Sequence, residues 1–578
     1  MIKNSYYIFL FFIYFVKENL KKFKDLLVVL VRFRVIHYLI FLINRDSNPY
    51  RGKPFRKFIA NNKKKWDENK VKDIDQSKDN ILVSSWIYSH PAGAVGESMI
   101  GKYVSDYYSY NQIGFILKGD IGSEVVLRSY GINKIIYLDK NNLFSRLKYF
   151  LKSVKIINKI KSIDEFLNLE INGINFGKSI YEHIVRFTGI GTIDKISFKF
   201  YYFLSEGLFI EHFCKKLTKK YQIKGLVQSE TQFIPCNIVY QFFINNSCKV
   251  YSRYGAGKKI SMRVFSEKKE IYNFSSEPSE STFNDILNNY KEIAIKRGLK
   301  ILEQTFQGNL KDNYSGSRDL AHENKKIYSK EEICNLYNWH KRKKIVCIFG
   351  HAFIDGNFLS GWRIFKDNLT WLRKTLTFIT KDKNYNWLVK PHPSEYEYVH
   401  SKTNTVKEFN SIASKFKHIK LAPNDISHRS LNEFVDYVVT NNGSVGWEYT
   451  TYGKKSLLAA RSDYSDFLFK KQMPKNEFEY FKKLENFENI EQVSEEQIEK
   501  AKIFSFLILD LCFVENLLYP ARYDVSLFVD TDKFWDEASD LVDNYSPEND
   551  YFKKMINYQL SNDLRHTMDL NTLKKNQY

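Results

Sequence analysis

From about residue 78 onward, short apolar runs alternate with longer stretches in which apolar residues recur every three or four positions. This alternation predicts β-strands and amphipathic helices in turn, which is typical of parallel α/β layers. The first unit is a strand over 80–87, a glycine-bearing turn over 90–97 and a helix over 98–108. Further strands are predicted at 113–117, 134–138, 225–229 and 249–252, with a helix at 206–220.

A second and more regular array follows a polar stretch at 309–330, where we place the crossing between two domains. Its predicted strands are 344–349, 386–390, 418–421, 435–440 and 455–460, and its predicted helices are 362–379, 406–416 and 427–434. The fold class is therefore α/β, with two Rossmann-like domains that face a cleft. The predicted organisation is a basic and aromatic membrane-associating segment and linker (1–75), an N-terminal domain (76–310), a linker (311–340), a C-terminal domain (341–492) and a helical region (493–578) that packs on one domain or crosses back over both.

The segment before the first domain is both apolar and basic. Residues 1–72 contain 17 Lys or Arg against 5 Asp or Glu, more than half of the net charge of +22, together with apolar runs at 6–16 and 26–43. The first run is shorter than the roughly 20 residues that span a bilayer, and arginines interrupt the second. Two interpretations stay open: the segment lies in the interface of an anionic membrane, or its runs are buried helices of the folded body and its Lys-rich end is a solvated linker.

Composition narrows the class of protein. With 43% hydrophobic and 27% charged residues among 578, the chain is neither disordered nor a polytopic membrane protein. Its six cysteines form no CxxC pair, so neither a zinc site nor a disulfide framework is indicated, and a reducing cytoplasm fits. No nucleic-acid-binding motif occurs, and the basic excess is concentrated in the apolar front segment.

Polar residues follow the strands of the second array, at the positions where open parallel sheets bind ligands. The sequence KPHP begins at Lys390, the last residue of the strand predicted at 386–390, and continues through Pro391, His392 and Pro393. The prolines stiffen the turn, and Lys390 and His392 would neutralise a phosphate. The alternative is a stiff loop whose histidine caps a helix.

A second polar loop follows the strand at 435–440, with the sequence NNGSVGWE. Its small residues let the backbone approach a ligand, Ser444 offers a hydroxyl, and the next helix would direct free N–H groups at an anion. Glu448 would accept hydrogen bonds from sugar hydroxyls or stabilise that helix. The loop is neither GxGxxG nor a Walker loop, which argues against NAD and ATP. Its candidate ligand-binding residues are Asn442, Gly443, Ser444, Gly446 and Glu448.

Carboxylates and a histidine occupy the remaining strand ends. His351 and Asp355 follow the strand at 344–349 and would lie at the same sheet edge. In the first domain, Glu97 and Glu230 are candidates for the general base on an acceptor hydroxyl, with a structural role as the alternative. Arg253 would pair with an acidic substrate group or with Glu230.

Three stretches between residues 344 and 460 carry a family resemblance: IVCIFGHAFIDGN, WLVKPHP and VTNNGSVGWEYTTYGKKSLLAA. They resemble the donor-binding half of bacterial capsule polysaccharide biosynthesis glycosyltransferases, a group that includes the Kdo transferases of capsule assembly. The resemblance implies a GT-B fold. In that family a Lys-x-His-Pro loop and a Ser-x-Gly-x-Glu loop hold the nucleotide and phosphate of an activated sugar, and here they correspond to Lys390, His392, Pro393, Ser444, Gly446 and Glu448.

The resemblance implies a glycosyltransferase of surface polysaccharide synthesis, cytoplasmic and peripherally associated with the inner face of the bacterial cytoplasmic membrane. It would use a nucleotide-sugar donor, preferably a CMP-linked acidic sugar such as CMP-Kdo, and a glycan or lipid-linked acceptor. It needs no cofactor, bound metal or nucleic acid. Two alternatives stay open, a CDP-glycerol-dependent glycerophosphotransferase and a non-catalytic scaffold of capsule assembly. The expected catalytic residues are His392, Glu97 and Glu230, and the expected donor-binding residues are His351, Asp355, Lys390, His392, Asn442, Gly443, Ser444, Gly446 and Glu448.

Overall fold

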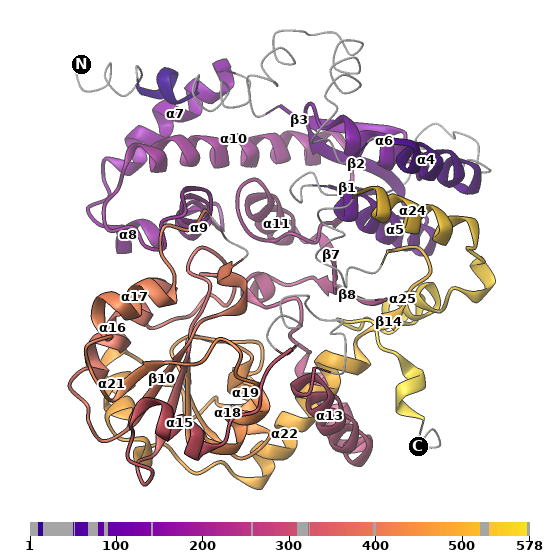
Figure 1. The fold of residues 1–578 in the computed structure, drawn as a ribbon. Coiled ribbons are helices and arrows are strands. Elements are labelled where there is room, and N and C mark those ends of the chain that lie inside the picture. The colour runs from indigo at the N-terminus through magenta and orange to yellow at the C-terminus, as the bar shows by residue number, and fades with distance from the viewer. Residues whose placement is uncertain are drawn as a thin grey trace.

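The structure is a computed structural model that describes residues 8, 10–15, 50, 52–66, 79–85, 91–139, 143–255, 258–308, 322, 324–396, 400–520 and 531–574. Two β-sheets, each flanked by helices, form an N-terminal and a C-terminal domain (Figure 1). The apolar run predicted at 26–43 and most of the predicted crossing at 309–330 lie outside the described residues. None of the described helices is both long and apolar enough to cross a membrane.

The N-terminal sheet has the strand order β14-β8-β7-β6-β1-β2-β3. β3, β2, β1, β6 and β7 are parallel, and β8 and β14 run antiparallel to their neighbours. All five residues of β1 are buried, as expected for an apolar strand at the centre of a sheet covered on both faces. The strands are β1 (Asn80–Ser84), β2 (Asn111–Leu117), β3 (Lys134–Leu138), β6 (Ile223–Val227), β7 (Lys249–Tyr254), β8 (Lys259–Phe265) and β14 (Val514–Glu515).

The helices of this domain cover both faces of its sheet. The turn predicted at 90–97 is wrong, because a helix already begins at Pro91. Gly96 of the predicted turn permits close packing instead, because a Cβ there would lie 2.3 Å from Arg253 Nε. The elements are α5 (Pro91–Tyr108), α6 (Ile121–Ser129), α7 (Leu143–Ile157), α8 (Ile163–Leu167), α9 (Phe176–Thr188), α10 (Phe198–Lys220), α11 (Cys236–Asn245) and the ribbon of β4 (Glu170–Ile171) and β5 (Ile174–Asn175).

The C-terminal sheet is fully parallel, with the order β11-β10-β9-β12-β13. The chain therefore reverses direction across the sheet between β9 and β12, which is the point where ligands bind in open α/β sheets. The strands are β9 (Ile345–Phe349), β10 (Asn386–Lys390), β11 (Ile419–Leu421), β12 (Tyr437–Thr440) and β13 (Lys455–Leu458). Its helices are α15 (Lys330–Tyr337), α16 (Asn368–Ile379), α17 (Thr405–Ile412), α18 (His428–Phe434), α19 (Val445–Thr450), α20 (Ser465–Leu468) and α21 (Glu477–Glu485).

The predicted α/β class with two parallel sheets is confirmed by these strand orders. The helix predicted at 362–379 begins only at Asn368, because Asp367 caps it by accepting a hydrogen bond from Thr370 N at 2.7 Å. Residues 351–367 instead form a long loop beyond β9.

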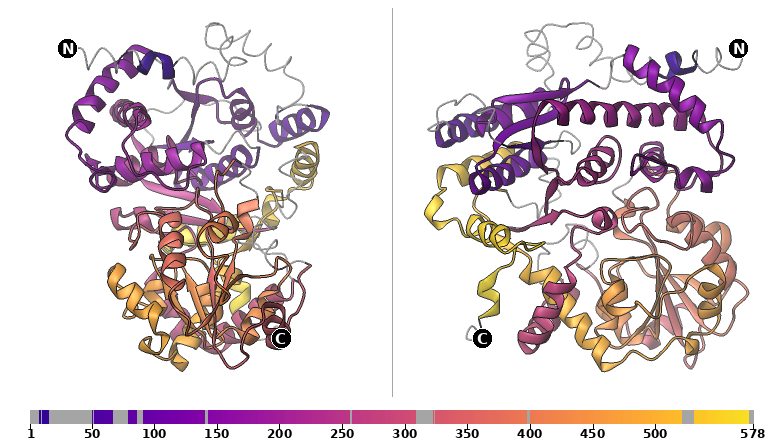
Figure 2. Two further views of the ribbon diagram at one scale, coloured as in Figure 1. Left: turned by 60° about the vertical axis from the view of Figure 1, so that its left-hand side comes forward. Right: turned by 180° about the vertical axis from the view of Figure 1, so that it is seen from behind.

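The C-terminal region returns from the second domain to the first (Figure 2). α22 packs on α13, β14 joins the N-terminal sheet, and α24 and α25 pack on α4 and α5. The remaining elements are α4 (Gly52–Trp66), α12 (Glu280–Asn289), α13 (Lys291–Phe306), α22 (Glu495–Phe506), a π-turn η4 (Leu507–Leu511), α24 (Thr531–Asp543), α25 (Tyr551–Ser561) and the 3-10 turns η1 (Lys268–Tyr272), η2 (Pro393–Tyr396), η3 (Phe487–Asn489), η5 (Pro547–Asn549) and η6 (Leu570–Leu573).

Two described parts of the basic front segment pack on the folded body. Phe58 of α4 is fully buried, with its ring 5.0 Å from that of Trp535, so this Lys-rich stretch is a helix and not a linker. Phe11 is also fully buried and packs on Phe150, with ring centroids 4.6 Å apart. For these residues the structure agrees with the second interpretation in that they pack on the folded body, and corrects it in that Lys-rich residues 52–66 form a helix.

The two domains contact each other closely through α9 and the chain that follows it. Tyr181 Oη donates to Asp367 Oδ2 at 2.6 Å, and Lys402 N donates to Gly189 O at 2.8 Å. One buried apolar cluster continues from the N-terminal into the C-terminal domain through this contact. The contact fixes the loops at the carboxyl ends of the two sheets relative to one another.

Candidate active site

Residues from three strand ends meet at the carboxyl edge of the C-terminal sheet. His351 follows β9 and His392 follows β10, and their rings stack with centroids 5.5 Å apart at an angle of 24°. Lys390 is the last residue of β10, and its backbone oxygen accepts a hydrogen bond from Gly350 N at 2.8 Å. The structure thus brings together three of the predicted donor-binding residues at the switch point of the sheet.

Lys390 is a buried cation with an exposed fraction of only 8%. Across the part of the chain that the structure describes, its ammonium group has neither a hydrogen bond nor an ion pair. Burial is the main reason that the pKa of Lys390 falls to about 8, and Lys325 lowers it further. A buried charge without an acceptor is costly, and an anionic ligand would remove that cost.

The two histidines are neutral hydrogen-bond donors. His392 Nδ1 accepts a hydrogen bond from Ser394 N at 3.2 Å, which places the ring proton on Nε2. Burial, His351 and Lys390 lower the pKa of His392 to about 3. Burial also lowers the pKa of His351. Without a ligand the His392 ring therefore offers an N–H and no positive charge, and a contact between His392 and a phosphate stays a prediction.

The loop after β12 holds oriented polar groups. Asn441 Nδ2 donates to Asn368 Oδ1 at 2.6 Å, and the side-chain oxygens of Asn441 and Asn442 are buried without a hydrogen-bond partner. Gly443 donates its N–H to Thr440 Oγ1 at 3.1 Å. The Ser444 hydroxyl has no hydrogen bond within the described ranges and does not cap the helix that follows. This loop therefore has spare hydrogen-bonding capacity beside His351.

Three N–H groups near the start of the helix that follows the loop already have acceptors. α19 is only six residues long, and the N–H groups of Gly446, Trp447 and Glu448 already donate to Gly443 O or Ser444 O at 3.1 Å. Gly446 is needed for packing, because a Cβ there would lie 2.1 Å from Tyr464 Oη. These three N–H groups are therefore already used within the loop and the first turn, and an anion site at this helix N-terminus stays a prediction.

Glu448 lies in the interior of the domain. Its exposed fraction is 2%, and its charge adds to the burial that raises the pKa values of Tyr449, Tyr452 and Tyr464. A role in binding sugar hydroxyls stays a prediction.

A charged cluster joins the carboxyl edges of the two sheets. Arg186 Nη1 of α9 lies 3.7 Å from Asp355 Oδ2 of the loop after β9. Burial and Asp355 raise the pKa of Glu182 on α9 to about 8. Burial and Asp355 also raise the pKa of Glu230, which follows β6, to about 7, although Arg186 opposes this shift. Glu230 is half-buried and has one carboxylate oxygen bonded to Gln232 N at 2.7 Å. Its pKa suits a general base at neutral pH.

Glu97 has a different environment from Glu230. It is 1% exposed, and its Oε1 accepts a hydrogen bond from Ser229 N at 3.2 Å. Arg253 Nη2 lies 3.9 Å from Glu97 Oε2, so the expected partner Glu230 is replaced by Glu97. The Arg253 side chain is 3% exposed and lies over the ring of Tyr519, and no hydrogen bond to its guanidinium is found among the described residues.

Sequence reasoning missed three residues that organise the site. Asn368 contacts His351 Nδ1 at 3.0 Å and accepts from Asn441, and thereby ties two loops together. Glu182 and Arg186 come from the interior of a helix in the other domain. No strand-end position marks any of these three residues in the sequence.

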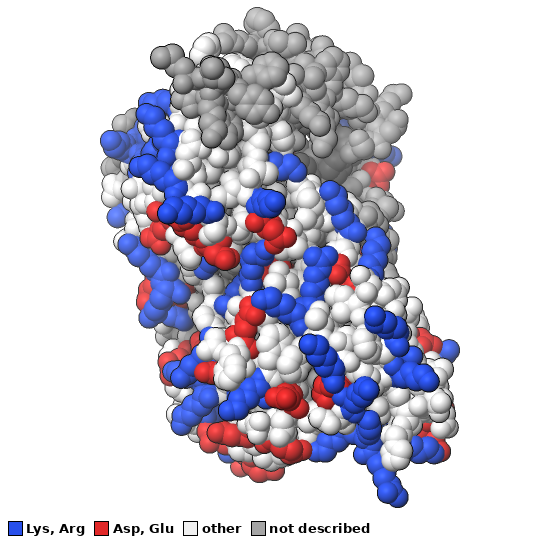
Figure 3. Space-filling view, turned by 90° about the vertical axis from the view of Figure 1, so that its left-hand side faces the viewer, with Lys and Arg blue, Asp and Glu red and all other residues white. Residues whose placement is uncertain are grey.

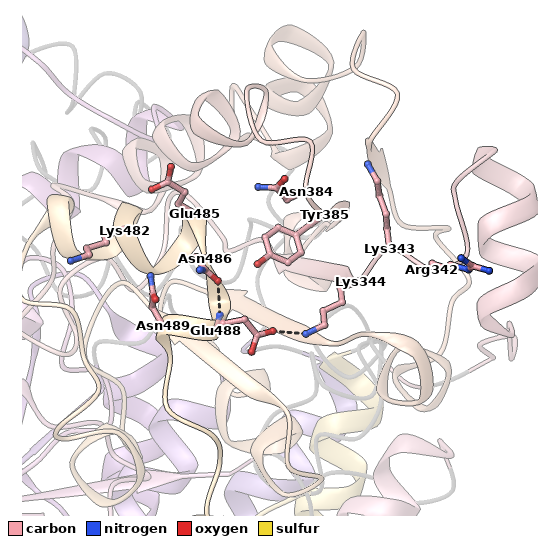
Figure 4. A pocket seen from close by; sticks show the side chains of 10 residues that line it. All are labelled: Arg342, Lys343, Lys344, Asn384, Tyr385, Lys482, Glu485, Asn486, Glu488 and Asn489. Carbon is pink, nitrogen blue, oxygen red and sulfur yellow. Dashed lines mark hydrogen bonds and ion pairs between the residues drawn. The ribbon is translucent and has the colours of Figure 1, made fainter.

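A surface hollow of about 720 Å³ lies at the opposite edge of the same sheet, before β9 and β10 (Figure 4). One ion pair lies within it: Lys344 contacts Glu488, and Tyr437 Oη donates to Glu488 at 2.7 Å. The Lys344 contact and the tyrosine lower the pKa of Glu488 to about 2. We therefore do not assign the ligand to this edge. Among the described residues, no group of three or more His, Cys, Asp and Glu side chains is arranged to hold a metal ion.

The strand orders define an α/β protein with two Rossmann-like domains. A search with protein-family models and a search of curated proteins both found no match to the chain. Among solved structures it is similar to the β-Kdo 2,4 transferase KpsC of Thermosulfurimonas dismutans, with 10% identity, 52% of this chain and 81% of that chain covered, and a TM-score of 0.29. It is also similar to S. aureus MnaA in a co-structure with UDP, with 10% identity, coverage of 74% and 94%, and a TM-score of 0.24.

A glycosyltransferase from Rickettsia africae ESF-5 is similar as well, with 11% identity, coverage of 81% and 100%, and a TM-score of 0.25. All three likenesses are distant, and the fold assignment rests on the strand orders of the chain itself.

Proposed function

We propose that this chain is a glycosyltransferase of capsule or other surface polysaccharide synthesis that uses a nucleotide-sugar donor. The observation that carries the proposal is the buried Lys390 without an acceptor, beside the neutral His392 and at the switch point of a parallel sheet. This arrangement suits the phosphate of a nucleotide. The resemblance of residues 344–460 to capsule glycosyltransferases supports a sugar nucleotide, with a CMP-linked acidic sugar such as CMP-Kdo preferred.

In the proposed reaction, the acceptor hydroxyl attacks the anomeric carbon and the bond from that carbon to the phosphate oxygen breaks. Lys390 and the Nε2–H of His392 bind the departing phosphate, whose negative charge grows in the transition state. The Ser444 hydroxyl and the Asn442 side chain provide further polar contacts to the donor. No cofactor takes part, because the nucleotide sugar is itself a substrate.

Glu230 accepts the proton of the acceptor hydroxyl. Its pKa of about 7 and its position at the domain junction support this role. Glu97 is buried and bonded to Ser229 N, so we give it the role of holding the Glu230 loop. Arg253 contributes N–H groups to a polar or acidic group of the acceptor. The acceptor is a glycan or a lipid-linked glycan, and the protein works at the cytoplasmic face of an anionic membrane.

A CDP-glycerol-dependent glycerophosphotransferase is the second candidate, since Lys390 and His392 recognise a phosphate and not the group attached to it. A non-catalytic scaffold fits less well, because the unpaired Lys390 would be a permanent cost without a ligand.

The test is a thermal-shift series of the full chain with CMP, CDP, UDP, GDP and ADP, alongside His392→Ala. A ligand that binds only the native state raises its melting temperature. We expect CMP to stabilise the protein and the variant to lose that stabilisation. A response to CDP followed by turnover of CDP-glycerol would replace the proposal by the second candidate, and no response to any nucleotide would overturn both.

A further inference from the structure

The outward face of α7 combines exposed apolar side chains with lysines. Phe144 and Leu151 are 86% and 42% exposed, and Lys148, Lys152 and Lys155 are exposed with them. These five positions recur at helical spacing and therefore form one line along the helix, here named the α7 stripe. So large an exposed aromatic side chain beside three cations is unusual for a surface that faces only water.

The inward face of the same helix is paired with the folded body. Arg146 is 1% exposed and pairs with Glu206 of α10 at 3.0 Å, and Ser153 Oγ donates to Tyr201 O at 2.9 Å. By contrast, no acidic side chain of the described chain forms an ion pair with a lysine of the α7 stripe. Within the described chain, the positive charge of the stripe is therefore not neutralised by a carboxylate.

Lysines of α10 extend the positive surface. Lys216, Lys219 and Lys220 are exposed at the end of α10 and have no ion pair in the described part of the chain. Burial lowers the pKa of His212, and Lys216 of α10 and Lys148 of α7 lower it further. Lysines of both helices therefore lie close enough to affect the same side chain. Figure 3 views the end of the molecule that carries α7, and Lys and Arg side chains gather at its upper left without acidic ones among them.

The apolar surface continues onto residues 10–15. Phe11 is buried against Phe150 of α7, whereas the adjacent Phe12 and Ile13 are 38% and 48% exposed. Figure 1 shows this short helix beside α7, at the end of the N-terminal domain farthest from the C-terminal domain. Exposed rings and cations thus share one side of the molecule, away from the candidate active site.

We propose that the α7 stripe, together with Phe12 and Ile13, docks the N-terminal domain on the surface of an anionic lipid bilayer. Aromatic and aliphatic side chains enter the headgroup layer, while lysines remain at its edge and pair with lipid phosphates. A nucleic acid would engage the lysines but would leave Phe144 and Leu151 without a role. The inference extends the membrane association of the proposed function by assigning the contact to the α7 stripe, Phe12 and Ile13. It holds whether or not the chain transfers a sugar.

The test is co-sedimentation of the full chain with phosphatidylcholine vesicles that contain either no anionic lipid or about 30% phosphatidylglycerol, at about 0.1 M salt. The intact protein should bind only the anionic vesicles. Replacement of Lys148, Lys152 and Lys155 by serine should weaken binding about 100-fold, since each lysine contributes a factor of about five. Phe144→Ser with Leu151→Ser should weaken binding at high salt as well as at low salt.

A matched control removes the same charge elsewhere. Lys381, Lys415 and Lys417 are exposed on the C-terminal domain, and their replacement by serine should leave vesicle binding unchanged. Equal binding by the two triple-lysine variants would overturn the inference, as would equal binding to neutral and anionic vesicles or release from vesicles by double-stranded DNA. Every variant should keep the melting temperature and the nucleotide response of the intact protein. His392→Ala should bind vesicles normally, which separates this inference from the donor site.

Discussion

Lys390 and Arg253 are both buried cations at the carboxyl edge of a parallel sheet, one in each domain, but their surroundings differ. Lys390 has no carboxylate at ion-pair distance within the described chain and lies beside two neutral imidazoles. Arg253 lies over Tyr519 and 3.9 Å from the Glu97 carboxylate. The C-terminal edge is therefore arranged to receive negative charge, whereas the N-terminal edge is nearly balanced in charge and presents oriented polar groups. Under the proposed function, the two sheets would serve different halves of one reaction, the donor phosphate and the acceptor hydroxyl.

The largest expected effect comes from a substitution at the carboxyl edge of the C-terminal sheet. His392→Ala removes the N–H that we place on the leaving phosphate, and kcat should fall about 1,000-fold because that donor acts mainly in the transition state. The melting temperature without ligand should change little. Steady-state kinetics with CMP-Kdo and an acceptor glycan measure the effect, and full activity of the variant would move the donor away from this edge.

Replacing Glu230 tests the N-terminal side. Glu230→Gln should lower kcat about 100-fold through loss of the base. In the intact protein, activity should rise with pH through about 7, because the base works only when deprotonated and its pKa is about 7. The pH profile of kcat/KM should lose this rise in the variant. A variant with the profile of the intact protein would show that another group accepts the proton.

The charge of Lys390 should make nucleotide affinity depend on pH, which tests whether the C-terminal edge binds an anion. Its pKa of about 8 lies below the usual value, so the unliganded site loses its charge as pH rises through 8. Nucleotide affinity should be constant below about pH 8 and fall about tenfold per pH unit above it. Calorimetric titration with CMP measures this, and Lys390→Arg should keep its affinity over the same range. An affinity independent of pH in both proteins would contradict an anion contact at Lys390.

Arg253 should show the smallest effect. Arg253→Lys keeps the charge but loses the planar set of N–H donors, so KM for the acceptor should rise roughly fivefold. The affinity for CMP should stay unchanged, because Arg253 belongs to the other sheet edge. If Arg253→Lys changed only the affinity for CMP, the N-terminal domain would bind the donor and the C-terminal domain the acceptor, the reverse of our assignment.

The sequence predicted the strands whose burial follows from their own apolar residues. The runs of β9, β10 and β12 are continuous apolar stretches, and their ends placed Lys390, His392 and Ser444 at one edge. The helix at 98–108 is confirmed, but the first part of α5 (91–97) is predicted as a turn because glycine occurs both where helices pack closely and where the chain bends. The two-residue β14 carries no pattern of its own and exists only because β8 offers it an edge.

The site was predictable only as far as strand ends reveal it. The tautomer and neutrality of His392 depend on the Ser394 N–H and on burial, neither of which is visible in the sequence. Glu182 and Arg186 reach the junction only because α9 packs on the other domain, and Asn368 because its helix begins beside His351. These contacts depend on tertiary arrangement and not on local residue type.

The completion of the N-terminal sheet by distant segments affects how the chain can be synthesised and folded. β8 is covered at its outer edge by Val514 and Glu515 and by residues 565–567, which pair with its middle. During translation β8 leaves the ribosome long before either segment exists, and its free N–H and C=O groups can meanwhile pair with other strands. A nascent or shortened chain that stops before residue 514 would therefore present an open sheet edge, and it should depend on chaperones until the last segments arrive.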